Sequence, residues 1–349
     1  MTRSHVRTVL VLVVAGGLVA LFLRNVDLWR VAANIRHAQP GWLALSLAMT
    51  FLNLAIRSLR WQYLLEPLGR TTFSNAFRAT AVGFAASAVL PARAGEVIRP
   101  YFLARLSRRG PGEPMSATGA FATIILERLL DIITVVVLLS LYVFGFGRAL
   151  GLQQPRAFAA AKWSAGVFGA GTLVVLAILF FVAKDPARLG RTFTRFERLL
   201  PVALAHMMAG VVEKFATGLA VVRRPGRLIG AFAWSFPLWL SIATGIWAVA
   251  VAFRFAVPFT GSFLLIALLV IGVAVPTPGA IGGFHEAFRV GATTFYGAPE
   301  AAAVGAAIVL HLFSIGPSLL LGLLFAAHEG LNVSGMRQLA DAAERGETA

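Results

Sequence analysis

Runs of apolar residues long enough to cross a membrane recur along this chain and constrain its fold more than any other feature. Of the 349 residues, 58% are apolar and 13% are charged, whereas a soluble domain carries about 25% charged residues. So much apolar surface could not be buried in a soluble core of this length. We therefore predict an all-α polytopic membrane protein in which residues 1–349 form a single transmembrane domain.

Six of the apolar runs are predicted to be spanning helices, because each is close to the ~20 residues that cross a bilayer. The first follows Arg3 and Arg7 as in a signal peptide, but it lacks a small-residue cleavage site, so we expect a retained helix. The stretch from Asp27 to His37 is predicted to be a short interfacial helix. The predicted spans are Val9–Leu23, Trp42–Tyr63, Ala117–Phe146, Ser164–Ala183, Leu228–Phe253 and Ala301–Ala327.

Two further apolar segments, Phe73–Leu106 and Phe259–Tyr296, are interrupted by prolines and glycines. The first break runs from Pro91 to Gly95 and the second from Pro276 to Gly283. Proline removes a backbone donor and glycine frees the backbone, so neither segment should continue as one straight helix. Non-helical backbone inside a membrane must be buried in protein or line a wet cavity. We therefore predict two re-entrant or broken-helix hairpins that meet inside the bundle.

The two hairpins belong to an internal repeat whose halves cover about 40–146 and 225–327. Several matches occur in the same order at nearly the same offset, which chance does not readily explain. The equivalent spans run in opposite directions across the membrane, so the repeat is predicted to be inverted, as in many secondary transporters. The recurring pairs include Pro40-Gly41 with Pro225-Gly226, and Glu96-x-x-Arg99 with Glu286-x-x-Arg289, at offsets of 185 and 190 residues.

The basic residues are unevenly distributed along the chain. The net charge of +16 could favour nucleic acid as a partner, but nine Lys or Arg fall between positions 57 and 109 and nine between 184 and 227. This positive-inside pattern predicts that both termini are cytoplasmic and that anionic inner-leaflet lipids, not nucleic acid, provide the counter-charge. Residues 184–227 are predicted to form a cytoplasmic basic amphipathic linker.

The residues typical of catalytic and metal sites are missing from the sequence. The chain has no Cys, which excludes disulfides, thiolate catalysis and cysteine-ligated metals. Metal-ligand spacings, a phosphate-binding glycine loop and a nucleophile elbow are also missing. His311, in the last span, is more typical of an interhelical hydrogen bond than of a proton relay. We therefore expect no catalytic residue, no metal, no cofactor and no enzymatic activity.

Two charged pairs follow the two breaks. Glu96 and Arg99 lie three residues apart on one helical face after the first break, and Glu286 and Arg289 repeat them after the second. Each could be a local surface ion pair worth almost nothing, or an anchor at the headgroup level. Their recurrence in both halves favours a shared polar site, to which Arg93 adds a second cation near the first break.

Three further charges, Glu127, Arg128 and Asp131, lie inside an apolar run. Each costs about 2.5–3.5 kcal/mol at the bilayer centre on insertion scales, so all three should face protein or water. Arg128 and Asp131 can pair along one helix face, and Glu127 needs another cation, for which Arg57 and Arg60 are candidates. The group is either a buried network that holds helices together or part of a substrate or ion pathway, and we favour the pathway.

Three strings in this order resemble one known family. They are AVLPARAGEVIR (88–99), ILERLLD (125–131) and PTPGAIGGFHE (276–286). Together they are similar to the lysylphosphatidylglycerol synthase transmembrane-region family, also called the flippase-like domain family, from about Trp42 to Ala327. The resemblance implies a polytopic lipid translocase, which in the synthase members moves aminoacylated phosphatidylglycerol between leaflets. The aminoacyl-transferase domain of those members is missing here, so synthesis of that lipid is not expected.

We accordingly expect a lipid flippase that binds the headgroup of a membrane lipid between the hairpins, in a bacterial inner membrane. A membrane-embedded transferase acting on a polyprenyl or glycosyl lipid is the alternative, and a non-transporting scaffold of a lipid-synthesis complex is a third. A lipid-synthesis enzyme and a second copy of the chain are the further partners considered. The motif positions, with Arg289 added through the repeat, give the candidate substrate-binding residues Arg93, Gly95, Glu96, Arg99, Glu127, Arg128, Asp131, Pro278, Gly279, Gly282, Gly283, Glu286 and Arg289.

Overall fold

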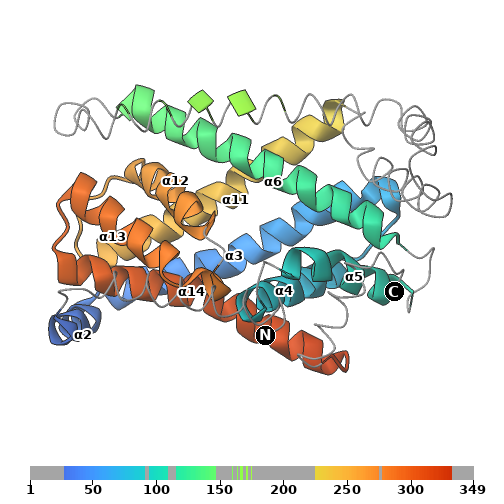
Figure 1. Ribbon diagram of the computed structural model, residues 1–349, viewed down its shortest axis with the longest axis horizontal. Coiled ribbons are helices and arrows are strands. Elements are labelled where there is room, and N and C mark those ends of the chain that lie inside the picture. Colours follow the sequence, from blue (N-terminus) through green and yellow to red (C-terminus); the bar gives the residue numbers. More distant parts are fainter. Residues whose placement is uncertain are drawn as a thin grey trace, which may run out of the picture.

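The computed structural model describes residues 27–90, 94–108, 115–146, 225–274 and 277–331, with isolated positions between 159 and 174. These residues are helical throughout apart from short connections (Figure 1). The predicted spans Val9–Leu23 and Ser164–Ala183, the linker 184–227 except for its last three residues, and both chain termini lie outside the described residues. The prediction of an all-α membrane protein is confirmed.

Three helices of the described part are long and apolar enough to cross a membrane. They are α3 (Pro40–Leu65), α11 (Pro225–Ala252) and α14 (Glu300–His328), and they correspond to three of the predicted spans. A fourth predicted span forms α6 (Ala117–Ser140), which continues as the π-helical segment η3 (Leu141–Phe146). Because α6 carries three charged residues within its apolar stretch, hydropathy alone identifies it less readily than the other three.

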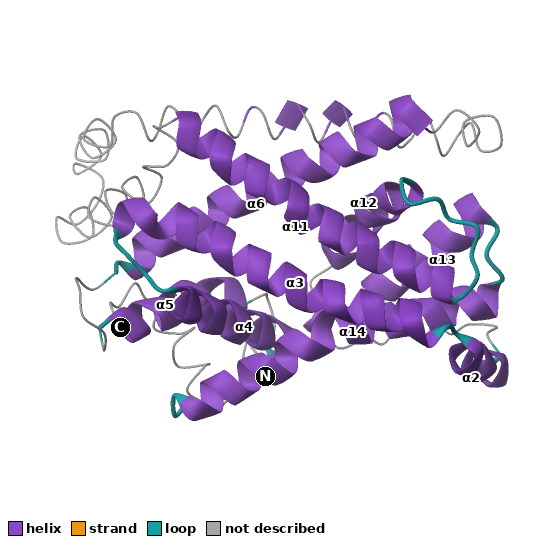
Figure 2. Cartoon of the chain, turned by 180° about the vertical axis from the view of Figure 1, so that it is seen from behind, coloured by secondary structure: helices purple, strands orange, loops and turns teal. Residues whose placement is uncertain are grey.

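Helices α3 and α11, the first helices of the two repeat halves, cross antiparallel in the middle of the molecule (Figure 2). Near the start of α3, Trp42 packs edge-on against Trp247 near the end of α11, with ring centroids 5.2 Å apart. At the opposite end, Glu66 pairs with Arg227. The two halves therefore run in opposite directions, as the inverted repeat predicted.

Both predicted hairpins are present as helix pairs joined by a break. The first pair is α4 (Phe73–Val89) and α5 (Gly95–Ser107). The second is α12 (Gly261–Ala274) and α13 (Gly283–Tyr296), with a single 3-10 turn, η6 (Pro278–Ala280), between them. The arms of α12 and α13 have 14 residues each, which is shorter than the ~20 needed to cross a bilayer.

Local backbone chemistry explains where the hairpin arms end. Leu90 is extended, with φ −98° and ψ 147°, because the ring of the following Pro91 disfavours a helical conformation of the residue before it. In the second break, Gly279 and Gly282 have φ values of +60° and +90°, a region that glycine enters without steric cost. The positions of proline and glycine therefore explain why the helix ends at both breaks.

Glycines let the two arms of each hairpin pack backbone to backbone. A Cβ atom placed on Gly95 would lie 1.7 Å from the carbonyl oxygen of Gly83, and one placed on Gly272 would lie 2.3 Å from that of Gly283. Only the missing side chain allows such an approach. A close glycine contact therefore joins the arms of both hairpins.

The two halves are interleaved rather than placed side by side. Helix α14 of the second half packs on α4 of the first, and α6 of the first half packs on α12 of the second. At the α14–α4 crossing, a Cβ on Gly322 would come within 2.2 Å of the Ala81 carbonyl oxygen. The second break also reaches the first hairpin, since a Cβ on Gly279 would lie 3.8 Å from the Ala88 carbonyl oxygen. The hairpins thus meet inside the bundle, as predicted.

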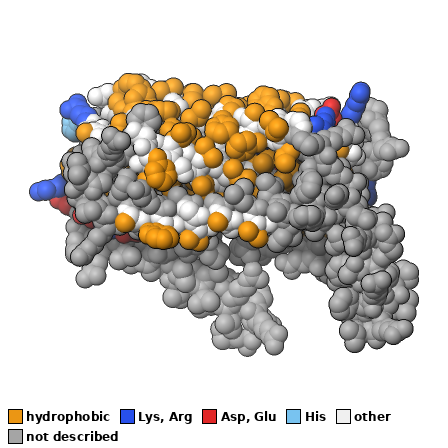
Figure 3. All heavy atoms as spheres, turned by 90° about the horizontal axis from the view of Figure 1, so that it is seen from above, with side chains coloured by type: hydrophobic (Ala, Val, Ile, Leu, Met, Phe, Trp, Pro, Cys, Tyr) orange, Lys and Arg blue, Asp and Glu red, His pale blue; other side chains and the backbone are white. Residues whose placement is uncertain are grey.

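The outer surface agrees with a membrane environment. Apolar side chains cover the middle of the face in Figure 3, and charged side chains gather at its two ends. At one end lies α2 (Leu28–His37), whose first backbone N–H groups are capped by Asp27. Val31 of α2 is buried while Trp29 is 87% exposed. This division between a packed face and an exposed face is the one expected of the predicted interfacial helix.

Candidate functional site

A cluster of charged side chains is buried where α3, α5, α6 and α11 meet. Helix α6 contributes Glu127 and Asp131, which are four residues apart and so lie on one face. Helix α3 contributes Arg57 and Arg60 from its last three turns. All four side chains are buried, which makes pairing necessary, since an unpaired charge inside a membrane is costly.

The arginines of α3 bind both acids of α6. The Arg60 guanidinium donates to Asp131 Oδ1 at 2.7 Å and to Glu127 Oε1 at 3.5 Å. Arg57 Nη1 donates to Asp131 Oδ2 at 3.3 Å. The sequence proposed both arginines as partners of Glu127: Arg60 contacts it, whereas Arg57 pairs with Asp131 instead.

The second helix of the first hairpin is tied to this cluster through Arg99. Its Nη1 donates to Glu127 Oε2 at 2.7 Å. Its guanidinium lies 3.8 Å from the ring centroid of Trp61, close enough for a cation–π interaction. The indole N–H of Trp61 donates in turn to the hydroxyl of Thr123 at 3.0 Å. Arg99 is thus held by a carboxylate and by an aromatic face.

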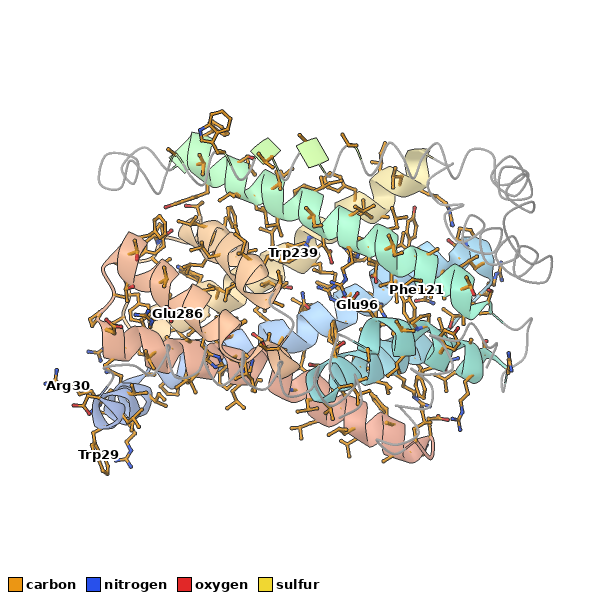
Figure 4. The ribbon with its side chains drawn as sticks, viewed as in Figure 1. Trp29, Arg30, Glu96, Phe121, Trp239 and Glu286 are labelled. Atoms are coloured by element: carbon orange, nitrogen blue, oxygen red, sulfur yellow. The ribbon has the colours of Figure 1, made fainter. Side chains whose placement is uncertain are left out.

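Helix α11 links the cluster to the second half of the repeat. The indole N–H of Trp239 donates to Asp131 Oδ1 at 3.1 Å, and Arg60 donates to the hydroxyl of Ser235 at 2.7 Å. Asp131 therefore accepts hydrogen bonds from two arginines and one tryptophan. Figure 4 places both Trp239 and Glu96 near the middle of the molecule.

Glu96 and Arg128 form the more exposed edge of the cluster. Arg128 Nε lies 3.2 Å from Glu96 Oε1, and Arg128 Nη1 lies 3.6 Å from Asp131 Oδ2. The side chains of Arg128 and Glu96 are 37% and 32% exposed, against 0% for Glu127. The sequence suggested that Glu96 would face Arg99 on α5, but each of the two instead reaches a partner on α6.

A cavity of about 670 Å³ opens beside this edge, between α3, α6, α11 and α12. Arg128 and Asp131 line its polar wall together with Asn53 and Ser241. The amide of Asn53 already donates to Ser241 and to the Leu238 carbonyl oxygen. Aliphatic side chains of α6 and α12 form most of the remaining lining. A charged wall on a largely apolar cavity suits a ligand that is polar at one end and apolar at the other.

The Glu286–Arg289 pair of the second half lies apart from this cluster. Figure 4 shows Glu286 toward one end of the molecule and Glu96 near its middle. Arg289 Nε donates to Glu286 Oε2 at 2.8 Å, and Arg289 also pairs with Glu300 at the start of α14. The repeated motif thus forms a local ion pair in the second half and a cross-helix pairing in the first, so the expected shared polar site is not formed by the two pairs.

The glycines of the motifs lie at the breaks, where they shape the backbone. Gly95 and Gly283 form the close hairpin contacts, and Gly279 and Gly282 supply the positive φ angles. Pro278 belongs to η6. Arg93 lies outside the described residues.

Two histidines support the second break. His311 Nε2 hydrogen-bonds with the Gly279 carbonyl oxygen at 2.7 Å, which is the interhelical hydrogen bond expected of it. His285 lies against His311, with ring centroids 4.4 Å apart. His285, Trp61, Trp239 and Ser235 were not predicted from the sequence to belong to the site. The sequence gives little to single these residues out, because tryptophan and serine are common in membrane helices for other reasons.

Comparison with known proteins places the chain in a family. A family model described as "Lysylphosphatidylglycerol synthase TM region" matches residues 8–322. The chain is 24% identical over 316 residues to the glycosyltransferase AglD of Haloferax volcanii, covering 84% of this chain and 49% of that protein. It is 21% identical over 197 residues to the UPF0104 membrane protein MJ1595 of Methanocaldococcus jannaschii, covering 56% of this chain and 54% of that protein. The chain spans about half the length of these relatives.

The family match includes both hairpins and the charged helix α6, and it agrees with the resemblance carried by the three sequence motifs. The chain belongs to the lysylphosphatidylglycerol synthase transmembrane-region family.

Proposed function

We propose that this protein is a lipid translocase that moves a polar-headed lipid between the two leaflets of a bacterial inner membrane. The observation that carries the proposal is the cavity of about 670 Å³ whose largely apolar lining ends at Arg128 and Asp131. A lipid headgroup would lie at this charged wall, and its tails would follow the aliphatic side chains of α6 and α12 toward the bilayer.

The interleaved halves support movement as well as binding. The charged wall joins α3 and α6 of one half to α11 of the other through Asp131 and Trp239. In transporters with inverted repeats, substrate sites lie near the midplane where the halves meet at broken helices. Rocking of one half against the other would open the cavity alternately to each leaflet. The hydrogen bonds from Trp239 to Asp131 and from Arg60 to Ser235 lie where the two halves meet.

The positive-inside pattern of the sequence supports an orientation with both termini in the cytoplasm. A downhill or ion-coupled mechanism is proposed, because the sequence contains no ATP-binding motif. We propose transport without chemical change of the lipid.

A membrane-embedded transferase acting on a glycosyl or polyprenyl lipid is the second candidate. One observation favours it, since a relative matched over 84% of this chain is named a glycosyltransferase. The match covers 49% of that protein, so the named activity need not belong to the shared part. A deletion strain separates the two candidates: a transferase changes the total amounts of its lipids, whereas a translocase changes only their distribution between leaflets.

The direct test is reconstitution of the full chain into vesicles that contain a tail-labelled phosphatidylglycerol. A membrane-impermeant quencher removes roughly half of the fluorescence from protein-free vesicles, because the inner leaflet is protected. Vesicles with the protein should lose almost all of it. Quenching that stops at the protein-free level for phosphatidylglycerol, phosphatidylcholine and lysyl-phosphatidylglycerol alike would contradict the proposal.

A further inference from the structure

We infer that the lipid headgroup bound at the charged wall carries a net negative charge, in the form of a phosphate group that Arg128 binds. This inference rests on the proposed lipid site and specifies its substrate class. Such a lipid differs in charge from aminoacylated phosphatidylglycerol, the cargo of the synthase members of the family, which carries an added cationic group.

The first argument is the charge balance of the cluster. Its described members are four arginines and three carboxylates, which leaves one positive charge in excess; they are Arg57, Arg60, Arg99, Arg128, Glu96, Glu127 and Asp131. An uncompensated charge at membrane depth is expensive. A bound anion would neutralise the cluster, whereas a bound cation would double its excess charge.

The second argument is which arginine of the cluster a ligand in the cavity could reach. The side chains of Arg57, Arg60 and Arg99 are at most 7% exposed, and that of Arg128 is 37% exposed. Of these four, Arg128 is the arginine that lines the cavity. Its guanidinium is planar with donors arranged as a fork, the geometry that matches a phosphate with two parallel hydrogen bonds.

The third argument concerns acceptors for a cationic headgroup. Within the described residues, Asp131 is the carboxylate that lines the cavity. Its oxygens already accept from Arg57, Arg60 and Trp239, and it is 4% exposed. A headgroup ammonium would therefore meet an acid that is buried and already accepts three hydrogen bonds. The unfilled capacity of the cluster is on the donor side: the Nε atoms of all four arginines, including the cavity-lining Arg128, and Nη2 of Arg99 have no hydrogen-bond partner among the described residues.

The test uses the purified full chain in a neutral detergent and measures its thermal stabilisation by short-chain lipids with identical tails. Phosphatidylglycerol, phosphatidylcholine and lysyl-phosphatidylglycerol carry net charges of about −1, 0 and +1, and inorganic phosphate tests the headgroup chemistry without tails. We expect the affinity to fall in the order phosphatidylglycerol, phosphatidylcholine, lysyl-phosphatidylglycerol, with about tenfold or more between the first and the last. Equal affinities, or the reverse order, would overturn the inference without any variant being needed.

Variants locate the effect. Arg128→Gln should bind phosphatidylglycerol at least about tenfold more weakly, and Arg128→Lys should keep the preference for the anion. The matched control is Arg78→Gln, which removes an arginine of similar exposure, 35%, that is paired with Glu329 and does not line the cavity. An unchanged preference in a folded Arg128→Gln protein would contradict the role of Arg128.

Two outcomes separate this inference from the proposed function. If inorganic phosphate binds as tightly as phosphatidylglycerol, the site recognises a free anion and the lipid part of the inference is wrong. If the vesicle assay shows that all three lipids cross at equal rates, the translocase proposal is supported and the proposed preference for an anionic headgroup is wrong. Tight, Arg128-dependent binding of phosphatidylglycerol without transbilayer movement would support the inference and refute the translocase.

Discussion

Replacement of Asp131 by Asn tests whether the buried ion pairs between α3 and α6 stabilise the protein. Asn has nearly the same shape and keeps one oxygen acceptor, so the change removes a charge with little loss of volume. The described cluster would then have four arginines and two carboxylates, and its excess positive charge would rise from one to two. Removing one partner of a buried ion pair typically destabilises by about 3–5 kcal/mol, because the other charge is left unpaired.

The midpoint of thermal unfolding in detergent, followed by the loss of the monodisperse gel-filtration peak, measures this effect. At about 2 °C per kcal/mol for a large domain, Asp131→Asn should unfold roughly 6–10 °C earlier than the unchanged protein. Glu300→Gln is the matched control, because Glu300 is paired with Arg289 but is 55% exposed. An exposed pair contributes at most about 1 kcal/mol, so the control should shift the midpoint by about 2 °C or less.

A second substitution checks the electrostatic explanation. Arg57 Nη1 lies 3.3 Å from Asp131, so Asp131→Asn with Arg57→Gln restores the original excess of one charge. We expect the double variant to regain at least half of the lost stability. Simple addition of the two single losses would show that the pair is not coupled. That result, or an Asp131→Asn protein as stable as the Glu300→Gln control, would refute the argument.

Three further changes probe other parts of the protein. Gly272→Ala should prevent folding, because its Cβ would lie 2.3 Å from a backbone oxygen. Its control, Gly226→Ala, meets nothing within 4 Å and should be neutral. The yield of monodisperse protein from each variant measures the difference. Glu96→Gln affects a side chain that is 32% exposed and pairs with Arg128, so it should lower the unfolding midpoint by about 2 °C or less yet slow lipid movement in vesicles severalfold, and full movement would remove Glu96 from the site. A cysteine introduced at position 340 should react with an impermeant reagent only in inverted vesicles, and labelling of intact cells would contradict the cytoplasmic C-terminus.

The helices and their inverted order could be predicted from the sequence because two physical signals are local. Apolar runs of spanning length identified α3, α11 and α14, and Pro and Gly positions identified both breaks. Interleaving of the halves could not be predicted in this way. It depends on close contacts such as that between Gly322 and Ala81, and the sequence does not show which small residue faces which helix.

The site was predicted in part. Charges inside an apolar run must find partners, and this rule led from Glu127 to the arginines of α3, although their stronger contacts are with Asp131. The same rule does not distinguish a partner on the same helix from one on a neighbouring helix. Arg99 therefore pairs with α6 and not with Glu96, while Arg289 keeps its local partner Glu286. Spacing alone does not predict this difference between the two halves.

The order of the charged residues along the chain also bears on membrane insertion. Asp131 follows its partner Arg60 by 71 residues, so at about 5–20 residues per second the acid is synthesised roughly 4–14 s after the arginine. During that interval Arg57 and Arg60 have no counter-charge from α6, and their position near the end of α3 lets their side chains extend toward the headgroups. We expect α3 to stay beside the insertion machinery, not yet stably inserted in the membrane, until α6 has been synthesised. A nascent chain stalled before α6 should consequently be extracted from the membrane more easily than one stalled after it.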